Sequence, residues 1–266
     1  MERKLGIITE CLKGVPSVET LELAHKVGFE AFFTGDCTYE GVAALRKRGD
    51  ELGMDFEFIH APFDGINTMW MPGLDYLDIF NRMKHSVDVA AAYGVPAIIS
   101  HVSSGWNPPA VNDLGIARYD ELVLYAKEKG VIVAFENLRK TGNLAMLMDR
   151  YEKMDNVQYC FDCGHEHCYT KTVSWFDLFT TKVLCTHIHD NHGRDLFDLK
   201  SDGDEHLLPF DGTYDYEKMI RKMDEYNYRG SLMLEVFNST HPDYLKMANE
   251  EFIQTSYDRI KKISQL

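Results

Sequence analysis

The sequence predicts an α/β protein built as a (β/α)8 barrel, in which eight parallel strands alternate with helices. Apolar runs of four to eight residues, rich in β-branched side chains, alternate along the chain with longer amphipathic stretches. These units recur eight times, with no break in composition between them. The length of 266 residues also suits one barrel, because this fold commonly takes about 250 residues. We therefore expect a single domain over residues 1–266.

A doubly wound open sheet is the alternative fold. It would need a glycine-rich phosphate-binding turn after the first strand, where the sequence has only ECLKG at residues 10–14. The barrel is favoured because it explains the number of units, the single domain and the polar strand ends together.

The first half of the chain contains four of the expected strands, at residues 5–9, 29–34, 55–60 and 95–101. Ser17 is expected to cap the first helix and Gly28 to end it. The later helices are expected to end near residue 53, to run from about 74 to 93, and to end near residue 130. A loop rich in proline, glycine and aromatic residues precedes the third helix, and residues 105–109 form a second such loop.

The second half contains the remaining strands, at residues 131–136, 157–161, 183–189 and 231–236. The fifth strand is almost purely apolar and β-branched, as expected of a strand buried on both faces. Helices are expected at 173–179, at 214–227 and at the end of the chain. Roughly 25 polar and glycine-rich residues follow the seventh strand, and a connection of that length inside a compact domain is usually functional.

From the third strand onward, the predicted strands end in side chains that bind metals. The six are His60, His101, Glu136, Asp162, His187 and Glu235, and adjoining loops add His165, Asp204 and His206. Any single one could be an ordinary polar strand end, but six in a row indicate a site, because all strand carboxyl ends of a barrel surround one mouth. Buried acids and imidazoles that converge without a cation would be costly. We expect a divalent cation, and these mixed ligands admit Mn, Mg, Co, Zn or Fe.

Asp162 and His165 form the most compact motif of this series. Asp162 ends the sixth strand, Gly164 is expected to break it, and His165 follows, so the two side chains can turn toward one point. The alternative is a turn with a solvated histidine. A zinc knuckle is disfavoured because no second Cys-x-x-Cys follows and Cys160 lies inside the strand; its candidate ligands would be Cys160, Cys163, His165, His167 and Cys168.

Charge and composition favour a cytoplasmic enzyme that acts on small molecules. Acidic residues outnumber basic ones by 42 to 28, and this balance disfavours unaided binding to nucleic acid or an anionic membrane. The six cysteines are scattered, as expected of reduced thiols. Residues 1–4 lead directly into a strand-like run without the apolar segment of a signal peptide, and no run of about 18 apolar residues occurs. Assembly into a homo-oligomer is left open.

Together these features resemble the xylose isomerase-like TIM-barrel superfamily. That group includes sugar isomerases and epimerases, inosose-type dehydratases and isomerases, and the endonuclease IV family. The resemblance rests on the strand-end series, the Asp162-x-x-His165 motif, HIHD at 187–190 and DEHLLPFDG at 204–212, and it covers nearly the whole chain. It implies a central ion held by Glu136, Asp162, His187 and Glu235. Further positions of a three-metal cluster in the endonuclease branch are matched by His60, His101, His165, Asp204 and His206.

The resemblance implies a metal-dependent isomerase or epimerase of a small sugar, sugar phosphate or polyol, with proton transfer through an enediolate. Glu136 and Glu235 would form the acid/base pair on opposite faces of the substrate, and His165 would hydrogen-bond its carbonyl oxygen. The expected substrate-binding residues are His60, His101, Trp106 and Arg194. Arg194 has a second interpretation as a surface arginine that pairs with a nearby aspartate.

A phosphodiesterase of the endonuclease IV type and a dehydratase on the same scaffold remain alternatives, as does a non-catalytic sugar-binding protein. Against the phosphodiesterase stand the acidic charge and Thr9-Glu10, which lacks the Gly-x-His type of start. The DNA-inserting arginine and tyrosine loops also have no obvious counterpart after strands two and three. The loops at these places carry Phe63, Met69 and Trp70 instead, and Trp106 follows strand four. Aromatic faces suit the apolar side of a sugar. The alternative for these aromatic residues is ordinary packing.

Overall fold

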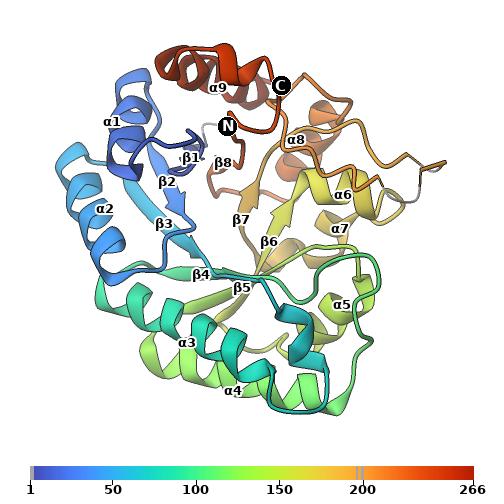
Figure 1. Cartoon of the computed structure of the whole chain (residues 1–266). Helices are drawn as coiled ribbons and strands as arrows, with labels where there is room; N and C mark the ends of the chain where they lie inside the picture. The colour runs from blue at the N-terminus through green and yellow to red at the C-terminus, as the bar shows by residue number, and fades with distance from the viewer. Residues whose placement is uncertain (1–2, 196, 199–200) are drawn as a thin grey trace. The chain divides into compact units, whose positions relative to one another are not determined.

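The computed structural model describes residues 3–195, 197–198 and 201–266, and it confirms the predicted fold class (Figure 1). Met1 and Glu2 lie outside the described residues, as do Leu196, Leu199 and Lys200 of the long connection after strand seven. Within the described residues, eight strands form one sheet in the order β7-β6-β5-β4-β3-β2-β1-β8. A parallel bridge from Ile188 to Leu234 joins the two ends of this order, as a closed barrel requires. The strands are β1 (Leu5–Ile8), β2 (Ala31–Thr34), β3 (Asp55–His60), β4 (Ala97–Ser100), β5 (Ile132–Glu136), β6 (Val157–Asp162), β7 (Val183–His187) and β8 (Leu232–Leu234).

Helices alternate with these strands along the chain. The described helices are α1 (Ser17–Val27), α2 (Tyr39–Leu52), α3 (Tyr76–Ala92), α4 (Asp113–Lys129), α5 (Thr141–Arg150), α6 (Cys163–Tyr169), α7 (Trp175–Phe179), α8 (Tyr216–Glu225) and α9 (Asn249–Ser264), with the short 3-10 helices η1 (Ile66–Trp70), η2 (Thr180–Lys182) and η3 (Tyr244–Lys246). The chain divides into two compact units, which are described in turn. The expectation of one domain over the whole chain stays a prediction.

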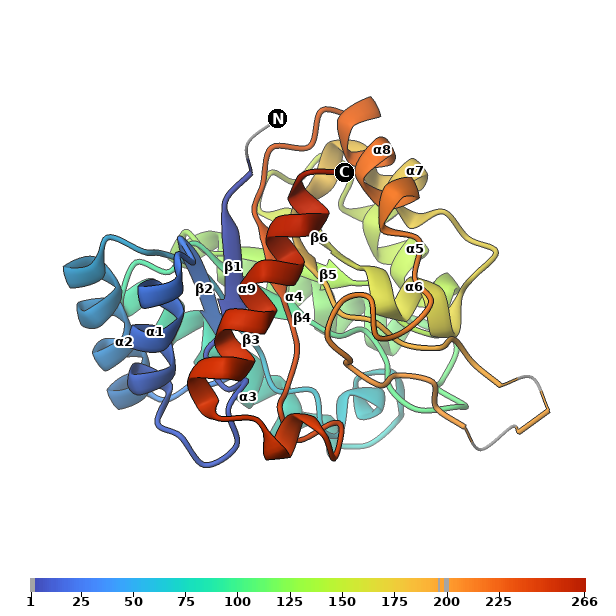
Figure 2. The same cartoon turned by 90° about the horizontal axis from the view of Figure 1, so that it is seen from above.

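The first unit contains residues up to 33, residues 44–56 and residues from 161 onward. In it, β1 pairs in parallel with both β2 and β8, and α9 lies beside α1 (Figure 2). Gly28 ends α1 with a φ of 114°, a left-handed conformation that glycine adopts without steric cost. A Cβ atom there would also come within 2.8 Å of the Tyr257 hydroxyl of α9. The predicted glycine stop is therefore confirmed, and any larger residue there would also have to displace the Tyr257 side chain.

The second unit contains residues 34–43 and 57–160. Its strands β4 and β5 pair in parallel, with Ile98 opposite Val133 and both side chains fully buried. Helices α3 and α4 lie side by side (Figure 1). Across the described part of the chain, no helix combines the length and apolarity that a membrane crossing needs.

The structure corrects three local expectations. Ser17 does not cap α1: its hydroxyl donates to Glu10 Oε1, and Pro16 occupies the cap position. Gly164 does not break the strand and His165 does not lie on a loop, because β6 ends at Asp162 and α6 begins at Cys163 and includes both residues. Helix α5 is absent from the predicted elements, although Leu144, Leu147 and Met148 recur at helical spacing and are all buried.

Candidate metal centre

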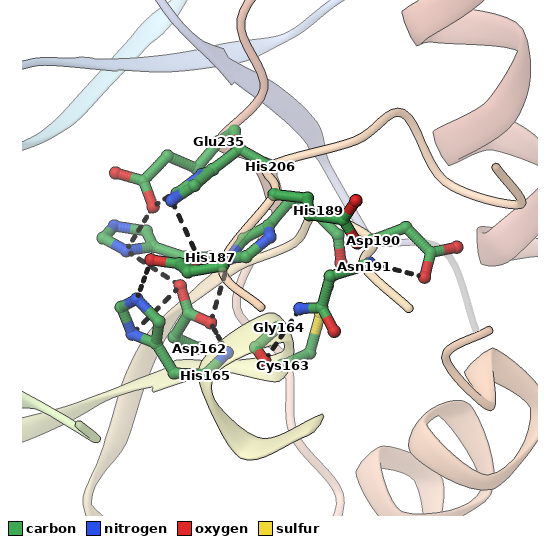
Figure 3. A network of polar contacts seen from close by, with 12 residues as sticks. Asp162, Cys163, Gly164, His165, His187, His189, Asp190, Asn191, His206 and Glu235 are labelled. Atoms are coloured by element: carbon green, nitrogen blue, oxygen red, sulfur yellow. Dashed lines mark hydrogen bonds and ion pairs between the residues drawn. The ribbon is translucent and has the colours of Figure 1, made fainter. Parts of the chain in front are cut away.

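Three of the predicted central ligands lie together in the first unit (Figure 3). Asp162 ends β6, His187 ends β7 and Glu235 follows β8. His187 Nδ1 lies 3.4 Å from Glu235 Oε2 and 3.8 Å from Asp162 Oδ2. All three side chains are buried. We call them the strand-end cluster.

A backbone hydrogen bond and a ring contact between strand residues hold the strand-end cluster in place. The backbone N–H of Glu235 donates to the Ile188 carbonyl, which fixes this residue against the end of β7. The His187 ring stacks on Phe33 of β2, with ring centroids 5.0 Å apart. Sites built on strands and packed rings keep their geometry better than sites on loops.

A second group of ligand-type side chains lies beside the first. His165 is on α6, His189 lies just beyond β7, and Asp204 and His206 come from the long connection. His165 Nε2 is 3.2 Å from Asp204 Oδ2, and His206 Nε2 is 3.4 Å from Asp204 Oδ1. One ligand atom from each of the four residues lies within 4.8 Å of the others. We call this group the loop cluster.

The sequence-based prediction missed His189. Its ring is fully buried and stacks on His206 at 3.9 Å between centroids, and its Nε2 lies 3.2 Å from Asp162 Oδ1. The expected strand extends to residue 189, and side chains two apart in a strand share a face, so the His187-x-His189 spacing could have revealed it. Gly164 makes room for this ring, because a Cβ atom there would lie 2.0 Å from His189 Cε1.

Electrostatics couple Asp204 to the imidazoles around it. Burial alone would raise the pKa of Asp204, but His206 and His165 hold it well below its usual range. Burial opposes the charged form of His206 as well, yet the Asp204 carboxylate outweighs this effect and raises the pKa of His206 to about 10. His206 Nδ1 donates to the Glu235 carbonyl at 2.9 Å, which leaves Nε2 directed at Asp204. Asp204 therefore supplies the negative charge of the cluster, and a cation bound there would replace the proton on His206 Nε2.

Two residues of the long connection have unusual backbone conformations. His206 has a φ of 47° and Phe210 a φ of 72°, the left-handed region that favours glycine. Such a conformation costs about 1–3 kcal/mol per residue, so it persists only where surrounding contacts hold it, and it is frequent at functional sites.

A third group lies in the second unit. Glu136 Oε2 is 3.1 Å from His101 Nε2 and 3.4 Å from His60 Nε2. His60 Nδ1 donates to the Ala61 carbonyl, which leaves Nε2 for the carboxylate. Phe63 stacks on His101 with ring centroids 4.1 Å apart.

The loop residues that were candidates to face the substrate divide into two kinds. Met69 and Trp70 are buried in η1, and Trp70 Nε1 donates to the Val102 carbonyl at 2.7 Å, so for these two residues the alternative of ordinary packing is confirmed and a role beside a sugar is wrong. Phe63 keeps 44% of its surface exposed. Trp106 is half-buried beneath the Arg139 guanidinium. Arg194 is half-buried, and substrate binding by Trp106 and Arg194 stays a prediction.

The clusters of the first unit fit a divalent cation. Ligand atoms about 2.0–2.2 Å from one ion stand roughly 3–3.6 Å from each other, and most separations here lie in or near that range. Asp204 Oδ1 is buried and has no hydrogen-bond partner among the described residues, as expected of a ligand atom. None of the ligand groups found in the described residues includes a cysteine, and Cys163 Sγ donates to the His189 carbonyl instead.

Comparisons with solved structures agree with the fold. A putative xylose isomerase from Rhodospirillum rubrum matches with a TM-score of 0.78 at 18% identity, over 99% of both chains. An L-ribulose 3-epimerase matches at 0.75 and 16%, over 99% of this chain and 95% of the other. A D-psicose 3-epimerase from Clostridium cellulolyticum, solved with D-tagatose, matches at 0.74 and 14%, over 98% and 99%. At these identities the likeness concerns the fold alone.

Sequence comparisons reach two further relatives. An uncharacterized protein, y4fM, of Sinorhizobium fredii is 30% identical over 167 residues, or 58% of this chain and 51% of that protein. An inosose dehydratase of Glaesserella parasuis is 25% identical over 133 residues, or 44% of this chain and 45% of the dehydratase. The matched stretches thus span about half the length of these two relatives. A model of the family described as xylose isomerase-like TIM barrel matches residues 21–263, and the chain therefore belongs to that family.

Proposed function

We propose that the protein is a metal-dependent isomerase or epimerase of a small sugar, sugar phosphate or polyol. The observation that carries this proposal is the strand-end cluster, in which two buried carboxylates flank a buried imidazole at the carboxyl ends of the strands. Active sites of this fold lie at that end, and such a donor set suits a divalent cation. In this proposal Glu136, which ends β5, is the fourth ligand, on the basis of the family resemblance.

A divalent cation bound there would polarise a substrate carbonyl and acidify the neighbouring C–H bond. The residues of the chain then move the proton. Glu235 removes it from one face of the carbon, and Glu136 returns it from the opposite face, which inverts that carbon. Return of the proton to the adjacent carbon would give isomerisation instead.

The loop cluster is proposed as a second cation site. If His165 binds that cation, it is not free to make the predicted hydrogen bond to the substrate carbonyl. Phe63, exposed beside His101, would support an apolar face of the substrate. Ketoses are the first substrates to test, because the similar structures include an L-ribulose 3-epimerase and a D-psicose 3-epimerase.

The decisive experiment is a screen of pooled ketoses, ketose phosphates and inososes after chelation and addition of Mn²⁺ or Co²⁺. NMR would follow the exchange of substrate C–H for deuterium from the solvent. Asp162→Ala and His187→Ala should lose the central cation and the exchange while remaining folded, whereas His25→Ala, at an exposed position on α1, should retain both. Full activity after exhaustive chelation would contradict the proposal.

A phosphodiesterase is the second candidate, because the loop cluster and the Glu136 group supply ligands beyond those of a single ion. Cleavage of DNA with abasic sites and three tightly held ions would favour it over the isomerase. A dehydratase would reveal itself in the same NMR screen through loss of water from the substrate, and an inert protein that binds a sugar tightly would indicate a binding function.

A further inference from the structure

Asp190 follows His189 directly and belongs to neither cluster. Its side chain is buried, and its carboxylate accepts three backbone N–H groups. Oδ1 accepts from Asn191 at 2.9 Å and from Tyr214 at 3.0 Å, and Oδ2 accepts from Phe210 at 2.9 Å. Its backbone also pairs with Leu207 in both directions, at 2.8 and 2.9 Å. One residue thus connects the end of β7 to residues 207–214.

These contacts lie at or beside the two residues of the long connection whose positive φ angles are unfavourable, His206 and Phe210. Leu207 comes directly after His206, and Phe210 is the other non-glycine residue with a positive φ in this segment. The Phe210 N–H is one of the three groups that Asp190 accepts. Asp190 therefore opposes relaxation of the segment that presents Asp204 and His206.

Asn191 extends the same support to α6. Its Nδ2 donates to the Gly164 carbonyl at 3.0 Å, directly before His165, and its Oδ1 accepts from the Gly193 N–H at 2.8 Å. Figure 3 shows Asp190, Asn191 and Gly164 beside His165 and His189. The partners of these two residues thus adjoin His206, through Leu207, and His165, through Gly164.

Gly212 independently indicates that the backbone at residue 212 must pass close to the Asp190 carboxylate. A Cβ atom at residue 212 would lie 2.3 Å from Asp190 Oδ1 and 2.4 Å from the Asn191 carbonyl oxygen. Only glycine lets the backbone pass so close without displacing the carboxylate.

We infer that Asp190 is a positioning residue: it holds Asp204 and His206 against His165 and His189 and so sets the affinity of the loop cluster for a divalent cation. This inference rests on the proposed second cation site. Partners of this kind behind metal ligands typically change metal affinity by about 10- to 100-fold when they are removed.

The test is Asp190→Asn, read by cation binding to the chelated protein. The amide replaces one acceptor oxygen by an NH2 group, so at least one backbone N–H faces a donor. We expect a 10- to 100-fold loss of Co²⁺ affinity at the loop cluster and unchanged affinity at the strand-end cluster. Visible absorption during Co²⁺ titration would follow each site, with His206→Ala and His187→Ala assigning the two steps, and elemental analysis would count the ions.

Gly212→Ala should produce the same selective loss through displacement of the carboxylate. Asp215→Asn is the matched control, because this exposed aspartate also accepts a backbone N–H, that of Lys218 at 2.9 Å, yet caps α8 outside the cluster. It should leave both affinities unchanged.

Four results would overturn the inference. An unchanged loop-cluster affinity in Asp190→Asn is the first. Equal weakening at both clusters, with a lower unfolding temperature of the cation-free protein, would indicate a purely structural role. A native protein that binds a single Co²⁺ at the strand-end cluster would end the inference but leave the proposed function standing. A native protein that binds no divalent cation would overturn both.

Discussion

Glu235 has two proposed roles that one substitution can separate. Glu235→Gln keeps the size of the side chain and one oxygen ligand but removes the base. We expect turnover to fall by about 10²- to 10⁴-fold, the usual contribution of general acid–base catalysis, with the cation still bound more weakly. Substrate deuterium exchange and Mn²⁺ binding would measure the two effects. Glu217→Gln, at an exposed position on α8, is the control, and normal turnover of the Glu235 variant would remove the proposed mechanism.

Glu166 is predicted to make the stability of the cation-free protein depend on pH. Burial raises the pKa of this carboxyl to about 7, and its Oε2 accepts the Trp175 N–H. The unfolded chain ionises near its ordinary pKa of 4.5, so stability falls as the pH rises from about 4.5 to 7 and is constant above that range. Because one pKa unit corresponds to about 1.4 kcal/mol, the loss is at most about 3 kcal/mol.

Glu166→Gln should therefore raise the unfolding temperature at pH 8 and change it little at pH 4.5, because glutamine retains the acceptor and has no charge to bury. Thermal unfolding of the chelated protein at both pH values would measure this. Equal shifts at the two values would show that ionisation of Glu166 is not the cause.

At the scale of elements, the segment between β3 and α3 is clamped rather than loose. Arg118 of α4 donates to four backbone carbonyls of this segment and stacks on Tyr76, with its guanidinium carbon 3.6 Å from the ring centroid. Asn67 and Ser104 add a reciprocal pair of hydrogen bonds, both 2.9 Å long. The segment that carries Phe63 is therefore held in place by these hydrogen bonds.

Arg118→Lys should destabilise the protein by about 1–3 kcal/mol, because an ammonium cannot reproduce the planar fork of donors and leaves buried carbonyls unpaired. Chemical denaturation would give the free energy change, and faster amide exchange at residues 68–73 would locate it. Arg221→Lys, at an exposed position on α8, is the control. Unchanged exchange in the Arg118 variant would mean that the segment holds without the clamp.

At the scale of the whole molecule, cation binding should be coupled to folding. The ligands converge only in the folded chain, so a cation at 100 times its dissociation constant should add about 2.7 kcal/mol of stability. The unfolding temperature of the chelated protein should rise with the logarithm of the Mn²⁺ or Co²⁺ concentration. The double variant Asp162→Ala/His187→Ala should lose the part of this response that comes from the strand-end cluster, and an equal response in both proteins would place the cation elsewhere.

Much of the fold and of the strand-end cluster can be predicted from local patterns. Buried parallel strands have a strong signature of apolar and β-branched residues, and a polar residue at the end of such a run stands out. Asp162, His187 and Glu235 are therefore recognisable from their positions in the chain. Helix α6 is not recognisable from the sequence, because it is only seven residues long and its glycine resembles a helix break. Helix α5 escapes prediction as well, although its apolar spacing carries a usable signal.

The sequence by itself determined the (β/α)8 class, because eight apolar runs can be buried together in few ways, and it singled out the three residues of the strand-end cluster. The tertiary structure alone decided which neighbours those residues have. It buried Met69 and Trp70, placed His189 against Gly164, and gave Asp190 its three backbone donors. These outcomes depend on contacts between segments distant in sequence, and local periodicity carries no information about such contacts.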